Sequence, residues 1–173
     1  GLSGAGRSSA ADDLEDIGWF VVDNLPVTLI DKIVELSSNG VGSGISRLAL
    51  VVGPTAGQAA VVGEIRRLRV SGHRVGVLFL DASTPELVKR YGSTRRKHPL
   101  DDGAGITLAI ERERAHLDQV KAEADLVLDT SALTVHQLKA RMGDLFAPDT
   151  AEAAMQVAVT SFGYKHGIPI DVD

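Results

Sequence analysis

The chain has 173 residues, a net charge of −5 at pH 7, 44% hydrophobic residues, no cysteine, and an aromatic content limited to one Trp, two Tyr and four Phe. This composition suits one domain with an aliphatic core, excludes disulfides, zinc thiolates and cysteine nucleophiles, and argues against a basic nucleic-acid-binding domain. Since no apolar run approaches the ~18 residues of a membrane span and no signal-peptide pattern is visible, the sequence predicts a cytoplasmic protein with no membrane partner.

Helical and strand patterns alternate along the first part of the chain. The spacing of apolar residues predicts helices over 7–17, 28–38 and 57–71, and strands over 19–22 and 48–52. The run 48–52 is continuously apolar, as in parallel strands that are buried on both faces.

The alternation continues to residue 145. The sequence predicts strands over 75–80 and 125–129 and helices over 85–96, 106–123 and 134–145, followed by an extended segment over 154–162. Strands separated by helices of this length are typical of an α/β fold with a doubly wound, mainly parallel sheet. We expect a boundary near residue 148 that divides a first domain (1–148) from a linker and the truncated start of a second domain (149–173).

The chain opens with GLSGAGRSS, which fits the phosphate-loop pattern G-x-x-x-x-G-K-[ST] with Arg7 in the lysine position. Gly1, Gly4 and Gly6 would let successive N–H groups converge on a phosphate, and a helix starting at Arg7 would add its positive end. We expect Arg7 to contact the β- and γ-phosphates and the Ser8 hydroxyl to bind Mg²⁺. The alternative is a flexible Gly- and Ser-rich terminus. Because this motif normally follows a strand, a first strand before Gly1 is expected.

Three carboxylates stand at predicted strand ends. Asp23 would lie at the ligand crevice of an open α/β sheet, where it could orient water, hold Mg²⁺ or accept a substrate hydroxyl proton. The alternative is an ordinary turn residue. For Asp81, capping of the next helix by the Ser83-Thr84-Pro85 segment is the favoured interpretation. The segment 129–131 could face a nucleotide base or form a plain loop.

A basic cluster lies at the end of the helix predicted over 85–96, comprising Arg90, Arg95, Arg96, Lys97 and His98. Such groups neutralise developing charge in phosphoryl transfer, and the alternative is contact with the negative end of the helix. No histidine metal site is predicted, since the five histidines are scattered (His73, His98, His116, His136 and His166). The chain also lacks the G-x-S-x-G pattern of a serine nucleophile.

Several segments resemble the RapZ/YvcJ-like nucleotide-binding proteins, also called RNase adapter proteins. They occur in order over nearly the whole chain: GLSGAGRSSA, LEDIGWFVVDNLP, LFLDAS, LVKRY, TRRKHPL, ADLVLDTSALTVHQL and SFGYKHGIPIDVD. VDNLP, TRRKHPL and FGYKHGIPID are more specific than the phosphate loop alone. With an arginine at position 7, the loop resembles that of the actinobacterial branch of this family.

The resemblance implies a three-layer, kinase-like P-loop domain that binds ATP and GTP with Mg²⁺, hydrolyses them slowly and acts as a regulatory module. It also implies a separate C-terminal domain, which in enterobacterial relatives binds a small RNA and an amino-sugar metabolite. The resemblance ends where that domain would begin, so an RNA or protein partner would depend on residues beyond it.

One departure concerns the segment after the strand at 48–52. The family pattern there is Asp-x-Arg-[Ser/Asn], whereas this chain has Gly53-Pro54-Thr55-Ala56, which matches by position only and lacks both charged groups. Weaker binding or slower hydrolysis is therefore expected. The rival interpretations are a small-molecule kinase, a nucleotide-sensing adapter without turnover and an RNA adapter; nucleotide preference and a homo-oligomeric state stay open.

Together these observations assign residues to three roles. The nucleotide-binding residues are Gly1, Leu2, Ser3, Gly4, Ala5, Gly6, Arg7, Ser8, Ser9, Gly53, Pro54, Thr55 and Ala56. The catalytic residues are Arg7, Asp23, Arg95 and Arg96. The metal ligand is Ser8.

Overall fold

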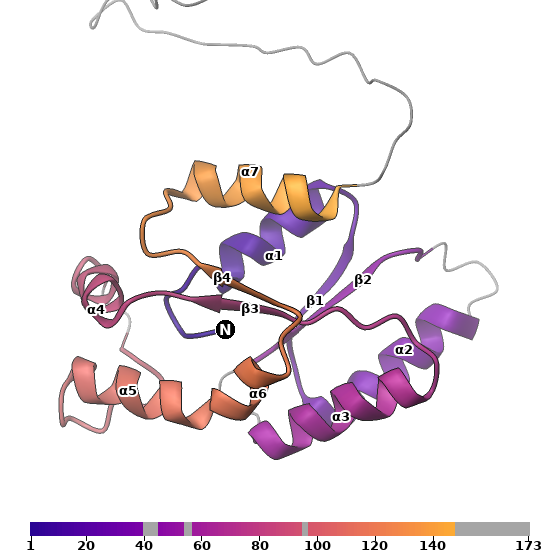
Figure 1. Cartoon of the computed structure of the whole chain (residues 1–173), viewed down its shortest axis with the longest axis horizontal. Coiled ribbons are helices and arrows are strands. Elements are labelled where there is room, and N and C mark those ends of the chain that lie inside the picture. The colour runs from indigo at the N-terminus through magenta and orange to yellow at the C-terminus, as the bar shows by residue number, and fades with distance from the viewer. Residues whose placement is uncertain (40–44, 54–56, 95–96, 148–173) are drawn as a thin grey trace, which may run out of the picture.

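The computed structural model describes residues 1–39, 45–53, 57–94 and 97–147 (Figure 1). In the first half, the elements are α1 (Arg7–Asp16), β1 (Phe20–Leu25), a short 3-10 helix η1 (Val27–Leu29), α2 (Ile30–Asn39), β2 (Leu48–Val52) and α3 (Gln58–Val70). In the second half, they are β3 (Leu78–Asp81), α4 (Thr84–Gly92), α5 (Ile106–His116), α6 (Asp118–Ala122), β4 (Leu126–Asp129) and α7 (Val135–Phe146). The extended segment predicted over 154–162 and the boundary near 148 lie outside these residues.

The described strands pair in parallel. β1 pairs with β2, starting at Phe20 opposite Leu48, and β3 pairs with β4, starting at Leu78 opposite Leu126. The predicted alternation of parallel strands and helices is therefore confirmed, and the fold is of the mixed α/β type. In the described residues β2 and β3 do not pair with each other, so the strands form two separate two-stranded sheets.

Helices cover the strands on two sides. Figure 1 shows α1 and α7 together on one side, and α2, α3, α5 and α6 on the other. The larger core cluster surrounds β3 and includes Leu2, which is fully buried together with Leu87, Ile110 and Met142. Because Leu2 belongs to this core, the start of the chain is anchored by apolar packing rather than left free in solvent.

The first strand is longer than predicted because its polar residues form a bulge. The strand was expected to end at Val22, before Asp23-Asn24, yet β1 continues to Leu25. The register jumps between the Val22–Leu50 and Leu25–Val52 pairs, and Asn24 takes a positive φ of 52°. The expectation that Asp23 follows the strand is thus wrong: Asp23 lies within β1, at an irregularity that locally interrupts the ladder.

The helix predicted over 106–123 is two helices, α5 and α6, divided at Leu117. The Leu117 N–H donates to the carbonyls of both Glu113 and Arg114, and the Leu117 side chain is buried in the core around β3. No glycine or proline occurs at this break. The break coincides with the burial of Leu117, which cannot be predicted from the local sequence. In the described part of the chain, no helix combines the length and hydropathy that crossing a membrane requires.

Candidate functional site

The loop before α1 follows a path that requires glycine. Gly4 and Gly6 have φ values of 84° and 94°, in the left-handed region where a side chain would be strained. The loop is tied to β3 by the Leu2 N–H, which donates to the Leu80 carbonyl at 3.0 Å, and it is closed by the Ala5 N–H, which donates to the Leu2 carbonyl at 3.1 Å. Residues 1–6 therefore have a defined backbone conformation beside the end of β3.

Partners from distant elements hold the carbonyl groups of this loop. Arg90 Nη1 donates to the Gly4 carbonyl at 3.1 Å, and the Thr130 hydroxyl donates to the Ala5 carbonyl at 3.0 Å. Arg90 is itself fixed by Glu86 at 3.2 Å and by the Thr130 carbonyl at 2.6 Å. As a result, these two carbonyl groups of the loop are hydrogen-bonded within the protein.

Some of the N–H groups of the same loop have no such partners. Within the residues that the structure describes, the N–H groups of Gly4, Gly6, Arg7 and Ser8 donate to no acceptor. Those of Arg7 and Ser8 also belong to the first turn of α1, where the helix offers N–H groups without internal partners and a positive dipole end. Consecutive free N–H groups of this kind form an anion-binding concavity.

The buried carboxylate of Glu113 holds the loop through hydrogen bonds. The Ser3 N–H donates to Glu113 Oε2 at 2.9 Å, and the Ser3 hydroxyl donates to Glu113 Oε1 at 2.6 Å. His98 Nε2 lies 3.1 Å from Glu113 Oε2, and the side chains of His98 and Glu113 are both fully buried. The loop is thereby connected to α5 and to the segment that contains His98.

The partners of His98 assign its tautomer. Its Nδ1 accepts a hydrogen bond from the Leu100 N–H at 3.1 Å, so the proton of the neutral ring is on Nε2, which donates to Glu113. The Tyr91 ring packs against the His98 ring at a centroid distance of 5.2 Å. Burial raises the pKa of Tyr91, and the negative charge of Glu113 adds to that rise.

Arg7 and Ser8 lie where the phosphate-loop pattern puts them. Arg7 is the first residue of α1 and is half-buried, and Ser8 follows it on the exposed side. Over the described ranges Arg7 makes no hydrogen bond or ion pair, and its charge lies close enough to Gly1 to contribute to a lowered amine pKa, after burial. An unpaired cation at the positive end of a helix is unfavourable unless an anion is added.

Asp23 lies within β1, and its neighbour Asn24 contacts Gly53. Asp23 is exposed, and its Oδ1 accepts a hydrogen bond from the Asn24 N–H at 2.7 Å. A Cβ atom on Gly53 would come within 2.6 Å of Asn24 Oδ1, so a larger residue there would require the exposed Asn24 side chain to move. No hydrogen bond or ion pair joins Asp23 to residues 1–9 in the part of the chain that is described.

The described residues of the predicted basic cluster lie in different surroundings. Arg90 is held against the loop carbonyls, and His98 is buried beneath the loop. Lys97 is exposed. Arg95 and Arg96, together with Pro54, Thr55 and Ala56, lie outside the described residues, so their assigned roles stay predictions.

The carboxylates that end β3 and β4 take part in local networks. Asp81 accepts hydrogen bonds from Arg114 at 2.8 Å and Lys121 at 2.7 Å, while Ser83 is the N-cap residue of α4, as the sequence predicted. Burial alone would raise the pKa of Asp81, but the hydrogen bonds from Lys121 and Arg114 outweigh it and hold that pKa below its ordinary value. Asp129 accepts from the Ser131 N–H and hydroxyl, which lowers the pKa of Asp129.

Glu113 is the residue of this site that sequence reasoning missed. In the run Glu111-Arg112-Glu113-Arg114 it reads as one more surface charge. A signal was available, because Glu113 lies three residues after the buried Ile110 and four before the buried Leu117, on the apolar face of the helix. A carboxylate on that face needs buried donors, and Ser3 and His98 supply them. No group of three or more His, Asp or Glu that could hold a metal occurs among the described residues.

The chain is similar to known proteins over its whole length. A model of the RapZ-like N-terminal domain matches residues 1–150. Curated relatives named nucleotide-binding protein come from Saccharopolyspora erythraea (47% identical), Thermobifida fusca (45%) and Desulfosudis oleivorans (42%), and each comparison covers 100% of this chain and 59% of the relative. The chain thus spans about three fifths of the length of these relatives. On the strength of the family match and these identities, the chain belongs to the RapZ-like N-terminal domain family.

Proposed function

We propose that residues 1–9 bind the phosphates of a nucleotide. The observation that carries the proposal is the division of roles within the loop: Arg90 and Thr130 hold the Gly4 and Ala5 carbonyls, whereas the N–H groups of Gly4, Gly6, Arg7 and Ser8 are free among the described residues. The names of the curated relatives support the same ligand class. Free N–H groups in a glycine-rich loop that leads into a helix N-terminus fit a polyphosphate better than a neutral ligand.

Each residue then has a defined contribution. The N–H groups of Gly4, Gly6, Arg7 and Ser8 would bind phosphate oxygens, and the Arg7 guanidinium would pair with the β- and γ-phosphates. Ser8 is exposed at the start of α1, so its hydroxyl fits the single protein ligand that Mg²⁺ takes when phosphates and water complete its shell. Mg²⁺ would neutralise charge on the phosphates.

The finer proposals follow the family resemblance. We propose ATP and GTP as the nucleotides, slow hydrolysis as the activity, and a doubly wound, three-layer P-loop domain as the architecture. Asp23 would position water or metal, and Arg95 and Arg96 would neutralise γ-phosphate charge. Among the described residues, no hydrogen bond or ion pair joins Asp23 to the loop of residues 1–9. Asp23 would therefore act only after nucleotide binding brings Asp23 and the loop closer together.

A second candidate function is nucleotide sensing without turnover. It is favoured by Gly53, which is packed against Asn24 at a position where the family pattern places a carboxylate. A small-molecule kinase, in which Asp23 accepts the substrate hydroxyl proton, is the third candidate. Phosphate release and product analysis separate the three.

The test is calorimetric titration of the chain with ATP and with GTP in the presence of Mg²⁺. We expect dissociation constants of roughly 1–100 μM, and Arg7→Ala should weaken binding at least about tenfold, or 1.4 kcal/mol. Arg7 has no protein partner in the described residues, so its removal should leave the unfolding midpoint unchanged. Arg141→Ala, an exposed arginine on α7, is the matched control and should bind as the parent does.

Two results would contradict the proposal: no binding of either nucleotide by the folded chain, or equal binding by the parent and Arg7→Ala. Micromolar binding with phosphate release supports the hydrolase. Binding with no phosphate release supports the sensor, and a phosphorylated small molecule identifies the kinase.

A further inference from the structure

The carboxylate of Glu113 orients one particular peptide of the loop of residues 1–9. The Ser3 N–H donates to Glu113 Oε2 at 2.9 Å. The carbonyl of the same peptide belongs to Leu2 and accepts from the Ala5 N–H at 3.1 Å. Because a peptide unit is planar, fixing the direction of its N–H also fixes the direction of its carbonyl. Glu113 thereby sets the hydrogen bond that closes the loop immediately before α1.

His98 completes the surroundings of that carboxylate. His98 Nε2 donates to Glu113 Oε2 at 3.1 Å, while His98 Nδ1 accepts from the Leu100 N–H at 3.1 Å. The His98 carbonyl accepts from the Asp101 N–H at 3.0 Å, so the segment from His98 to Asp101 is a hydrogen-bonded turn. An unbroken series of hydrogen bonds therefore joins this turn to the Ser3 peptide.

A ring contact joins the same two segments. The Tyr91 ring packs against the His98 ring at a centroid distance of 5.2 Å. A Cβ atom on Gly4 would lie 3.1 Å from Tyr91 Cε2, so Tyr91 is in contact with the loop as well as with His98. A displacement of His98 would thus change the surroundings of Gly4 in addition to those of Ser3.

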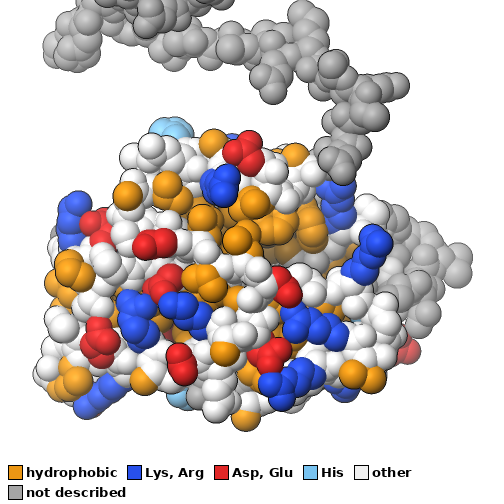
Figure 2. All heavy atoms as spheres, in the orientation of Figure 1, with side chains coloured by type: hydrophobic (Ala, Val, Ile, Leu, Met, Phe, Trp, Pro, Cys, Tyr) orange, Lys and Arg blue, Asp and Glu red, His pale blue; other side chains and the backbone are white. Residues whose placement is uncertain are grey.

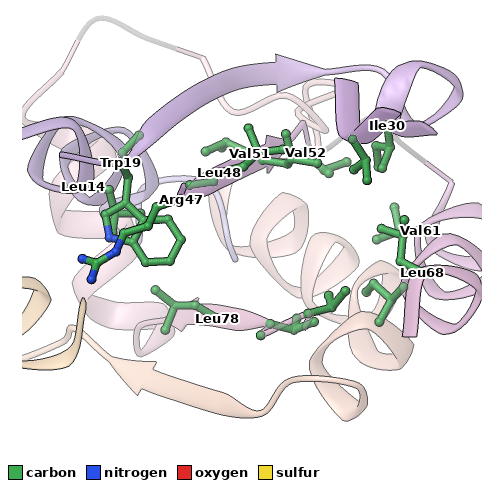
Figure 3. Close-up of a pocket in the computed structure, with 18 of the residues that line it drawn as sticks. Leu14, Trp19, Ile30, Arg47, Leu48, Val51, Val52, Val61, Leu68 and Leu78 are labelled. Carbon is green, nitrogen blue, oxygen red and sulfur yellow. The ribbon is translucent and has the colours of Figure 1, made fainter. Parts of the chain in front are cut away.

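The hydrogen-bond network of Ser3, Glu113 and His98 belongs to neither the cavity between the sheets nor the outer surface. The cavity of about 700 Å³ lies between Leu48 of β2 and Leu78 of β3 (Figure 3), and its lining includes no member of the network. Charged side chains of both signs are interspersed over the surface in Figure 2, whereas the side chains of His98 and Glu113 are closed to solvent. Within the described residues, the hydrogen bonds of this carboxylate lead only to the loop and to the turn that begins at His98.

We propose that Glu113 and His98 are positioning residues, which set the affinity of the loop for phosphate through the Ser3 peptide and never contact the ligand. This rests on the proposed binding of phosphate at residues 1–9. Because a coupling between two sites is reciprocal, phosphate bound at the loop also stabilises the hydrogen bond between Leu100 and His98. The network thus communicates occupancy of the loop to the turn that begins at His98.

Two substitutions of His98 each remove one of its side-chain hydrogen bonds. His98→Gln can place its amide nitrogen near the position of Nε2 and keep the bond to Glu113, but it leaves the Leu100 N–H without its acceptor. His98→Asn can place its amide oxygen near the position of Nδ1 and keep the bond from Leu100, but it does not reach Glu113. Both lose the ring that packs against Tyr91, so each substitution is the matched control for the other.

The first measurement is calorimetric titration with ATP in the presence of Mg²⁺. We expect His98→Asn to weaken ATP binding at least about fivefold and His98→Gln less than about twofold, because only His98→Gln keeps the donor to Glu113. Glu113→Gln can still accept from the Ser3 N–H and from His98, so its affinity should stay within about twofold of the parent. A role in stability alone would not separate the affinities of two folded His98 variants.

The second measurement is amide hydrogen exchange of single residues by NMR, which needs no ligand. The Ser3 and Ala5 amides should exchange at least about fivefold faster in His98→Asn than in the parent, and within about twofold of the parent rate in His98→Gln. Addition of ATP to the parent should slow exchange at Leu100 at least about threefold. This response to ATP should be absent in His98→Asn.

Three outcomes would overturn the proposal: equal weakening of ATP binding by both His98 substitutions, an affinity of His98→Asn equal to that of the parent, or unchanged exchange at Leu100 when ATP binds. If the folded parent binds no ATP, the proposed function is contradicted instead. Exchange at Ser3 and Ala5 in the unliganded variants then still decides whether the network positions the loop.

Ser3→Ala replaces His98→Asn if that variant does not fold. It removes the hydroxyl that donates to Glu113 Oε1 at 2.6 Å and keeps the N–H that donates to Glu113 Oε2. We expect Ser3→Ala to weaken ATP binding at least about threefold and to abolish the response of Leu100 to ATP. An affinity and a response equal to those of the parent would overturn the proposal.

Discussion

Glu113 directly supports the conformation of the loop formed by residues 1–9. Its two oxygens accept from the Ser3 N–H, the Ser3 hydroxyl and His98 Nε2, in a place closed to solvent. Each of these donors would be buried without a partner if the carboxylate were removed. The network therefore fixes the loop by satisfying polar groups rather than by attraction between surface charges.

Glutamine and alanine at position 113 should have clearly different effects. In Glu113→Gln, the side-chain oxygen can still accept from the Ser3 N–H and His98, and the amide can donate to the Ser3 hydroxyl. Glu113→Ala leaves those donors unsatisfied, so we expect it to lower the free energy of unfolding by about 3 kcal/mol, against less than about 1 kcal/mol for glutamine. Urea unfolding measures both values. Equal losses would mean that the negative charge, and not the hydrogen-bond geometry, is what matters.

At the scale of single residues, the sequence predicts the loop but not its supports. Gly4, Gly6, Arg7 and Ser8 follow from a local pattern of nine residues. The support from Glu113 depends on contacts with residues 15 and 110 positions away, which no local pattern contains. Arg90 was recognised as a basic residue near a site, yet its contact with the Gly4 carbonyl could not be foreseen.

At the scale of elements, the packing of α1 against α7 contains an unsatisfied charge. Asp13 lies on the buried face of α1, and its Oδ2 has no hydrogen-bond partner among the described residues. Burial raises the pKa of Asp13, although Lys139 opposes the shift. A folded-state pKa above the unfolded value means that ionisation of Asp13 destabilises the fold as the pH rises through that pKa.

Asp13→Asn should therefore stabilise the chain at neutral pH. We expect a gain of about 1 kcal/mol or less in the free energy of unfolding, and the gain should disappear below the pKa of Asp13, where the parent is also uncharged. Asp12→Asn is the matched control, because Asp12 is exposed on the same helix turn. Denaturation at neutral and acidic pH measures the difference; a destabilised Asn variant would show that the carboxylate has a favourable role.

Among the elements, the continuous apolar runs predicted strands but not all of their bounds, since the strand predicted over 75–80 is observed as β3, which begins at Leu78 and ends at Asp81. The strand predicted over 48–52 is observed with the same bounds as β2, and β4 differs from its prediction by one residue. β1 was underestimated because Asp23 and Asn24, which are typical turn residues, form a bulge in a strand whose partner determines its length. The break at Leu117 also depends on tertiary packing.

At the scale of the whole molecule, the hydrogen bonds that shape the loop of residues 1–9 also set an order in time. Residues 2, 3 and 5 each have a hydrogen-bond partner far along the chain, at Leu80, Glu113 and Thr130, up to 125 positions later. The loop therefore cannot take its final shape during synthesis until residue 130 has left the ribosome. Contacts of such high sequence separation close late and slow folding. The part of the chain made first is, in this molecule, among the last to be organised.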